Sequence, residues 1–222
     1  MNPAKSETLA AFARWRISAV LRADDAGVAR QGMEAAVSGG IRIAEFTMNT
    51  PEALSLIAEF SGRPELMVGA GTVLTVEQAR EATQAGARFI VSPVCDPLVI
   101  AEANSLGAVT VPGTFTPTEM MSAHRAGADM VKLFPMPGIG PRYVEALLAP
   151  MPFLKIFPTA GVTVDNFLDF LAAGAWGVGM TTSLFEPQDL AARRFDRVRR
   201  RAEEITRRFK EWVGTARSSP GD

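Results

Sequence analysis

The chain has 222 residues, of which 47% are hydrophobic and 21% are charged, and its formal net charge at pH 7 is −1. This composition is typical of a globular protein with a large core, and the charge gives no general attraction to nucleic acid or to membranes. A single cysteine, Cys95, excludes an intrachain disulfide and a cysteine-based metal site. Because no apolar run approaches the roughly 18 residues of a membrane span and no signal-peptide pattern opens the chain, we expect a cytoplasmic protein.

Strand-like and helix-like segments alternate along the chain, after an extra N-terminal helix that is predicted within residues 1–15. The strands are predicted at residues 17–21, 41–47, 66–70, 88–91, 108–111, 130–134, 153–157 and 176–179. The helices that follow them are predicted at residues 25–38, 51–60, 76–85, 97–105, 117–126, 141–149, 163–172 and about 188–213. Residues 214–222 are expected to form a flexible tail.

Glycines recur at five joints between a predicted helix and the next predicted strand, as at Gly86, Gly107 and Gly127. Glycine can take the left-handed position that ends a helix, so these residues mark a repeating unit. Eight βα units with short joints indicate an α/β protein with a (β/α)8 TIM barrel, and we expect residues 1–222 to form one domain. An open doubly wound sheet is the alternative, but it predicts fewer units and a glycine-rich stretch after the first strand.

Lys132 stands in the middle of an apolar predicted strand. An ammonium group is rarely buried without a partner, and Glu45, in the second predicted strand, is a candidate partner inside the barrel. One interpretation is a buried structural ion pair. The other is amine catalysis, because an apolar interior lowers the pKa of a lysine and leaves a free amine that attacks carbonyls. Lys155 is the rival lysine, but it lies near the start of a strand, where polar residues more often serve stability.

Polar residues also gather at the ends of the predicted strands, where barrel enzymes place their chemistry. Arg22 ends the first strand, and Thr47 shares a face with Glu45 because side chains alternate along a strand. Further candidates at later strand ends are Asn49, Thr72, Pro93, Phe134, Thr159, Gly161, Thr182 and Ser183. Simpler interpretations remain open: the threonine hydroxyls cap local backbone, Phe134 is a core residue, and Arg22 is a surface charge at the rim.

Several of these residues fall in stretches whose order and spacing form one pattern. The stretches are Gly39–Thr47, Val68–Leu74, Ile90–Pro93, Val131–Pro135 and Pro158–Val162. Together, over residues 17 to 186, the chain resembles the class I 2-dehydro-3-deoxy-phosphogluconate (KDPG) aldolases. Their 4-hydroxy-2-oxoglutarate (KHG) and 2-dehydro-3-deoxy-6-phosphogalactonate relatives share the pattern.

The resemblance implies a (β/α)8 homotrimer in which Lys132 forms a Schiff base with the C2 ketone of a small-molecule 2-oxo acid. It implies that Glu45 handles protons and that retro-aldol cleavage releases pyruvate. The resemblance implies no metal and no other cofactor. We expect no nucleic-acid or membrane partner, because the net charge is −1. The basic last helix is interleaved with acidic residues, and we interpret it as a solvated closing helix.

The segment after the second strand departs from the phosphogluconate branch, which has an arginine there that binds the substrate carboxylate. Here the residues are Thr47-Met48-Asn49-Thr50, without that arginine. The phosphogalactonate branch is more similar, because it has an arginine after strand one and an asparagine after strand two, as at Arg22 and Asn49. A guanidinium on the neighbouring strand can hold the same carboxylate in a bidentate manner.

Two further departures lie where phosphate is expected to bind. Ala160 stands where the family more often has glycine, and Met180-Thr181 replaces a glycine before a serine. Backbone N–H groups at Gly161, Thr182 and Ser183 are still expected to hold a phosphate, as loops at this end of such barrels do. Thr159 and Thr72 match positions that line the pyruvate pocket in the family.

The sequence therefore predicts a lyase, a class I aldolase that cleaves a 2-dehydro-3-deoxy-6-phospho-sugar acid to pyruvate and glyceraldehyde 3-phosphate. One alternative is an aldolase for an unphosphorylated acid such as 4-hydroxy-2-oxoglutarate. Another is a phosphate-binding barrel without imine chemistry, either an acid–base enzyme or a non-catalytic ligand-binding protein.

Overall fold

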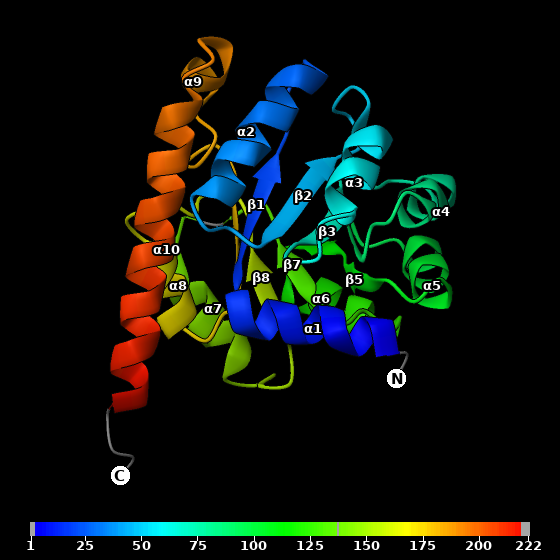
Figure 1. Cartoon of the computed structure of the whole chain (residues 1–222). Helices are drawn as coiled ribbons and strands as arrows, with labels where there is room; N and C mark the ends of the chain where they lie inside the picture. Colours follow the sequence, from blue (N-terminus) through cyan, green and yellow to red (C-terminus); the bar gives the residue numbers. More distant parts are fainter. Residues whose placement is uncertain (1–2, 137, 219–222) are drawn as a thin grey trace.

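A computed structural model describes residues 3–136 and 138–218 and shows an α/β fold in which helices surround curled parallel strands (Figure 1). The strands are β1 (Ile17–Leu21), β2 (Ile43–Thr47), β3 (Met67–Gly71), β4 (Phe89–Val91), β5 (Val109–Val111), β6 (Gly113–Thr114), β7 (Val131–Leu133), β8 (Ile156–Pro158) and β9 (Val178–Met180). The helices are α1 (Pro3–Trp15), α2 (Ala26–Ser38), α3 (Ala53–Ser61), α4 (Val76–Gln84), α5 (Pro97–Ser105), α6 (Pro117–Arg125), α7 (Pro141–Leu148), α8 (Phe167–Ala172), α9 (Pro187–Ala191) and α10 (Phe195–Ser218).

The strands within residues 3–136 and 138–218 form a six-stranded sheet in the order β5-β4-β3-β2-β1-β9 and a three-stranded sheet in the order β6-β7-β8. The strand pairs are parallel, as in the register Val20↔Glu45 between β1 and β2. The strands curl into a half-barrel with helices outside, which confirms the α/β class predicted from the alternating pattern. Because parallel strands end at the same side, the residues after them meet there.

Helix starts follow the local chemistry that the sequence carries. The side chain of Thr116 accepts a hydrogen bond from the backbone N–H of Glu119, and the Glu119 side chain accepts one in return from the backbone N–H of Thr116. This capping box fixes the start of α6, and a proline at its first turn suits a position without an N–H partner. Helix α8 begins at Phe167, later than predicted, because Thr163 and Asn166 bond each other in a turn before it.

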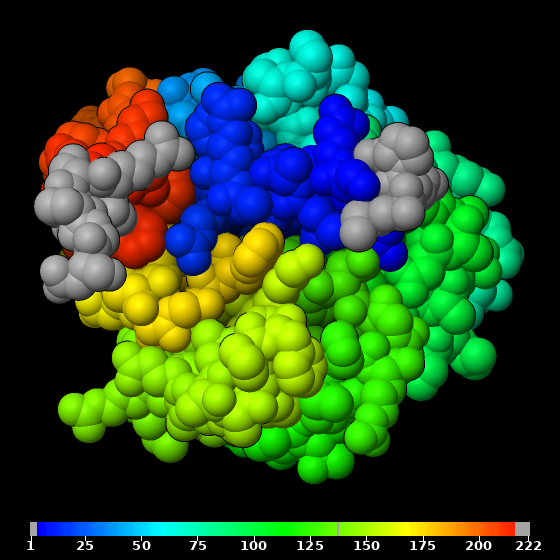
Figure 2. Space-filling model, turned by 90° about the horizontal axis from the view of Figure 1, so that it is seen from below, coloured from blue at the N-terminus to red at the C-terminus, as the bar shows by residue number. Residues whose placement is uncertain are grey.

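Aromatic side chains fill the end of the half-barrel where the strands begin. The ring centroid of Phe12, on α1, lies 5.0 Å from that of Phe89 and 5.6 Å from that of Phe157, both edge-on. Helix α1 lies across this end, and Figure 2 shows its blue segment over the middle of the lower face. Because buried aromatic side chains fill this end, we expect the polar side chains of a site at the opposite end, where the strands terminate.

Three further segments differ from the elements predicted. The strand predicted at 153–157 begins later, at Ile156, because Phe153 is exposed and Leu154 closes a turn onto Met151. β6 was not predicted, since two residues give no readable period. The last helix is divided into α9 and α10, and the residues between them include Arg193 at φ 51°, outside the helical region.

The C-terminal residues complete the fold as follows. Residues 214–218, predicted to be part of a flexible tail, continue α10, while 219–222 lie outside the described residues. Among residues 3–136 and 138–218, no helix combines the length and the apolar character needed to cross a membrane.

Candidate active site

Lys132 lies in β7, with Gly113 and Phe157 as its register partners on the two neighbouring strands. Only 6% of the lysine is exposed, and its Nζ lies 4.6 Å from the centroid of the Phe134 ring. Burial lowers the pKa of Lys132; the charge of Glu45 acts against this shift and the charge of Arg22 adds to it. The net lowering favours the neutral amine, which is the form that attacks a carbonyl.

Glu45 lies in β2, between Val20 of β1 and Gly69 of β3 in the sheet register, and is 2% exposed. A Cβ atom on Gly71 would lie 2.0 Å from Glu45 Oε1, so the glycine leaves the space that the carboxyl group occupies. Within the described residues, this buried Oε1 has no hydrogen-bond partner. Burial raises the pKa of Glu45 to about 7, although the charges of Lys132 and Arg22 lower it. A carboxyl group poised near neutral pH is suited to accept and return a proton.

Both side chains face one pocket of about 650 Å³ at the carboxyl ends of the strands. The pocket has the size and the mixed lining of a small-molecule site. Nine of the residues predicted from the sequence are among the described residues that line it: Arg22, Glu45, Thr47, Thr72, Pro93, Lys132, Phe134, Thr159 and Thr182. The geometry therefore brings the candidate nucleophile, the candidate proton carrier and several hydroxyl groups into one cavity.

Asn49, Gly161 and Ser183 are not among the described residues that line the pocket. Asn49 is exposed in the turn after β2. The hydroxyl group of Ser183 donates to the carbonyl of Val162 at 2.8 Å, so it is occupied by the fold. Gly161 has φ 71° and lies beside Met136, where an added Cβ would stand 3.0 Å from that side chain.

Arg22 lies at the exposed rim and reaches across to β3. Its Nη2 donates to Thr72 Oγ1 over 3.4 Å, a long contact that holds the guanidinium above the pocket. Among residues 3–136 and 138–218, no group of three histidine, cysteine, aspartate or glutamate side chains is placed to hold a metal ion.

Comparisons with known proteins agree with this geometry. The family model described as KDPG and KHG aldolase matches residues 10–201. The chain belongs to the KDPG and KHG aldolase family. This confirms the resemblance predicted from the five sequence stretches, and with it the assignment to the aldolases, which are lyases.

Several relatives of this aldolase family are similar over most of their length. A probable 2-dehydro-3-deoxy-6-phosphogalactonate aldolase of Rhizobium meliloti (strain 1021) is 38% identical over 69% of this chain and 74% of its own. The 2-dehydro-3-deoxy-6-phosphogalactonate aldolase of Escherichia coli (strain K12) is 31% identical over 88% of this chain and 95% of its own. A solved native KDPGal structure has a TM-score of 0.79 and 30% identity, and the match covers 89% of this chain and 96% of that chain.

One departure from the aldolase pattern has a structural counterpart. Ala160 adopts φ 67°, the left-handed region that glycine favours, so the loop after β8 keeps this backbone conformation without the glycine. Within the described residues, the N–H groups of Thr182 and Ser183 donate to no backbone carbonyl. They are therefore available to an anion in the loop after β9.

The sequence interpretation missed the far wall of the aldolase pocket. Phe185, Pro187, Leu190 and Ala191 line it, and they come from the loop after β9 and from α9. The solvated closing helix was predicted from about residue 188, so Leu190 and Ala191 were assigned to it and Phe185 and Pro187 to the loop before it. Pro187, at the first helical position of α9, was the available signal that a helix begins there.

Proposed function

We propose that this protein is a class I aldolase that cleaves a 2-dehydro-3-deoxy-6-phospho-sugar acid to pyruvate and glyceraldehyde 3-phosphate. The observation that carries the proposal is the pair of Lys132 and Glu45 in one pocket, with the pKa of the lysine lowered and that of the carboxyl group raised to about 7. Membership of the KDPG and KHG aldolase family supports it.

Lys132 is the nucleophile of the proposed reaction. Its free amine attacks the C2 ketone, and the amine proton passes to the ketone oxygen to give a carbinolamine. The carbinolamine takes a second proton from Glu45 and loses water, which gives a protonated imine. Glu45 then removes the proton of the C4 hydroxyl group while the C3–C4 bond breaks, and the bond electrons pass into the imine. The aldehyde leaves, C3 of the resulting enamine takes a proton from Glu45, and water hydrolyses the imine to pyruvate and free Lys132.

Arg22 and Thr72 are proposed to bind the carboxylate next to the reacting ketone, with Asn49 and Thr47 beside them. The bond between Arg22 and Thr72 supports this role, because it directs the guanidinium over the pocket. Asn49 does not reach the pocket without a change of its exposed turn, so its part in this group rests on the family resemblance alone. Phe134 and Pro93 are proposed to shape the apolar wall around the imine.

The distal phosphate is proposed to bind at the loops after β8 and β9. Thr159 contributes a hydroxyl group, and the backbone N–H groups of Gly161, Thr182 and Ser183 belong to these two loops. The free N–H groups of Thr182 and Ser183 support this assignment, since backbone N–H groups at such loops bind phosphate. Of these residues, Thr159 and Thr182 line the pocket.

The complete architecture is proposed to be a single-domain (β/α)8 barrel. An isolated parallel bridge between Thr159 and Gly179 supports closure beside β9. The bond from the Lys132 N–H of β7 to the carbonyl of Pro112, which stands between β5 and β6, supports pairing across the gap between the two sheets. A cytoplasmic homotrimer is proposed from the family resemblance; light scattering should then give the mass of three chains.

The proposed reaction is tested by coupling pyruvate release to a reporter enzyme. The substrates are the phosphorylated galactonate and gluconate derivatives and 4-hydroxy-2-oxoglutarate. We expect turnover of a phosphorylated acid by the wild-type chain, and loss of that turnover in Lys132→Arg, which keeps a long basic side chain but cannot form the imine. Appreciable activity of Lys132→Arg would contradict imine chemistry, and preference for 4-hydroxy-2-oxoglutarate would move the function to the unphosphorylated acid.

A further inference from the structure

The far wall of the pocket is one continuous segment between β9 and α10, residues 181–191, which we call the wall segment. Thr181, Thr182, Phe185, Pro187 and Leu190 of this segment line the pocket. Its only regular part is the five-residue helix α9. A single helical turn is not stable by itself in water, so other contacts must hold the wall in place.

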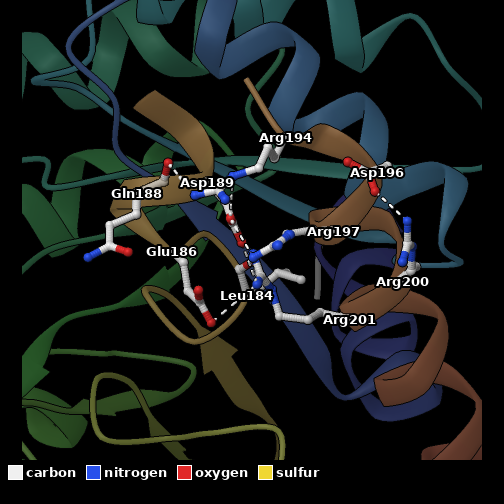
Figure 3. A network of polar contacts seen from close by, with 9 residues as sticks. All are labelled: Leu184, Glu186, Gln188, Asp189, Arg194, Asp196, Arg197, Arg200 and Arg201. Carbon is white, nitrogen blue, oxygen red and sulfur yellow. Dashed lines mark hydrogen bonds and ion pairs between the residues drawn. The ribbon is translucent and has the colours of Figure 1, made fainter. Parts of the chain in front are cut away.

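Asp189 of α9 contacts a cluster of three arginines, of which Arg194 precedes α10 and Arg197 and Arg201 belong to it. Figure 3 shows the side chains of Arg194, Arg197 and Arg201 directed toward it. Its carboxylate lies 3.1 Å from Arg194 Nε, 3.4 Å from Arg197 Nη1 and 2.7 Å from Arg201 Nη1. Only 1% of the Asp189 side chain is exposed, so this charge depends on the arginines for its stabilisation.

Arg201 connects the cluster to the rest of the wall segment. Its Nε donates to the carbonyl of Leu184 at 3.0 Å, and its Nη1 lies 3.2 Å from Glu186 and 2.7 Å from Asp189. One guanidinium thus binds the loop after β9 and the helix that follows it. The planar group, with several donors in fixed directions, suits this task in a way that a lysine ammonium does not.

The carboxyl group of Asp189 is ionised at neutral pH. Burial alone would raise the pKa of Asp189, but the hydrogen bond from Arg201 and the charges of Arg201, Arg197 and Arg194 lower it below its ordinary value. Neither Asp189 nor Arg201 is among the described residues that line the pocket. Any influence on the substrate must therefore pass through the wall segment.

We propose that Asp189 and Arg201 are positioning residues that set the affinity for the distal, phosphate-bearing end of the substrate. They hold the wall segment so that the free N–H groups of Thr182 and Ser183 and the apolar side chains of α9 keep their places. The inference rests on the proposed function. It adds that specificity at this end depends on an ion cluster behind the wall, which touches no substrate.

Arg201→Lys and Asp189→Asn test the inference in steady-state kinetics with the phosphorylated sugar acid. Each should raise KM about tenfold, while kcat stays within about threefold, because binding at the distal end is lost without harm to the reacting centre. The Ki of inorganic phosphate as a competitive inhibitor should rise by a similar factor. Borohydride trapping of pyruvate on Lys132 should proceed at the wild-type rate.

Matched variants show whether the effect belongs to this cluster. Asp196→Asn removes an aspartate–arginine pair on α10 that is exposed to solvent, and it should leave KM and the phosphate Ki unchanged. Arg197→Gln removes the longest contact to Asp189 and should give a smaller rise in KM than Arg201→Lys. The double variant of Asp189 and Arg201 should lose little more than either single variant, since both act through one contact.

These measurements distinguish failure of the proposed function from failure of the positioning inference. If the wild-type chain releases no pyruvate from a phosphorylated acid, the proposed function is wrong. If the wild-type chain turns that acid over and Arg201→Lys leaves both KM and the phosphate Ki unchanged, the positioning inference alone is wrong. A fall in kcat and in pyruvate trapping together would also overturn it, because the wall would then serve the reacting centre.

Discussion

At the scale of single residues, the charges of Lys132 and Glu45 change each other's pKa, and burial changes the pKa of both groups. Burial lowers the pKa of Lys132 and raises that of Glu45, and each charge partly offsets the shift of the other. Burial is the larger effect for both groups, so the neutral forms are favoured relative to water. A free amine and a carboxyl group that titrates near neutral pH are the forms that imine chemistry needs.

The pH dependence of turnover follows from Glu45. Its pKa of about 7 predicts that pyruvate release falls as the pH drops below 7, because the protonated carboxyl group cannot accept the C4 hydroxyl proton. Glu45→Gln should lower kcat by a factor on the order of 10² to 10⁴ and remove this acid limb. Glu59→Gln, which changes a half-exposed carboxylate on α3, is the control and should keep the wild-type profile. An unchanged acid limb in Glu45→Gln would contradict the assignment.

The site residues inside strands follow most directly from the sequence. Lys132, Glu45 and Thr47 lie where alternation along a strand places them, and the structure brings all of them to the pocket. The residues predicted beyond the strand ends divide into two groups. Six of them line the pocket, namely Arg22, Thr72, Pro93, Phe134, Thr159 and Thr182, whereas Asn49, Gly161 and Ser183 do not. Asn49 and Ser183 sit in turns, where a side chain's direction depends on local dihedral angles and on bonds such as that of Ser183 to Val162. No sequence period encodes these directions.

At the scale of elements, β3 leaves room for the carboxyl group of Glu45 on β2. In Gly71→Ala the new methyl group would occupy the place of Glu45 Oε1, so the carboxyl group must move. We expect pyruvate release to fall about a hundredfold, since displacement of a reacting group by about 1 Å has effects of that size. Gly138→Ala is the control, because among the described residues no heavy atom lies within 4 Å of a Cβ built there. Full activity of Gly71→Ala would show that Glu45 is free to repack.

Helix α1 stabilises the opposite end of the strands through Phe12. Phe12→Ala should lower the free energy of unfolding by about 3–5 kcal/mol, because it opens a cavity beside Phe89 and Phe157. The same change at Phe153, which is 52% exposed, should cost far less. Urea denaturation of both variants measures the difference. Equal losses would mean that α1 contributes little to the core.

The order of elements was predictable from the sequence because each joint carries a glycine, a proline or a capping side chain. The division of the last helix was not. Its arginines and acids fit a continuous amphipathic helix, and the break depends on Asp189, whose carboxylate is buried against side chains further along the chain. Such tertiary contacts override the local preference for helix.

At the scale of the whole molecule, the buried site lowers stability in a pH-dependent way. Glu45 has a raised pKa in the folded chain, so between about pH 4.5 and about 7 the folded chain holds a proton that the unfolded chain has released. The contribution of Glu45 to the free energy of unfolding therefore falls as pH rises through this window. The total decrease is on the order of 3 kcal/mol. This is the expected cost of keeping a carboxyl group in an apolar interior.

Glu45→Gln tests this cost, since glutamine resembles the protonated acid in shape. The variant should match the wild type in its free energy of unfolding near pH 4.5 and exceed it near pH 8, as measured in urea at both pH values. An equal increase in the free energy of unfolding at both pH values would mean that the variant is stabilised by packing and not by removal of the ionisable group. A loss at pH 8 would mean that the ion pair with Lys132 outweighs burial.

The central claim is that Lys132 is the residue that forms an imine with substrate. Its most direct test is to add pyruvate and borohydride to the wild-type chain and to locate the adduct by peptide mass spectrometry. We predict one reduced pyruvate adduct on the peptide that contains Lys132, and none in Lys132→Arg. Absence of the adduct, or its appearance on Lys155 near the start of β8, would contradict the account.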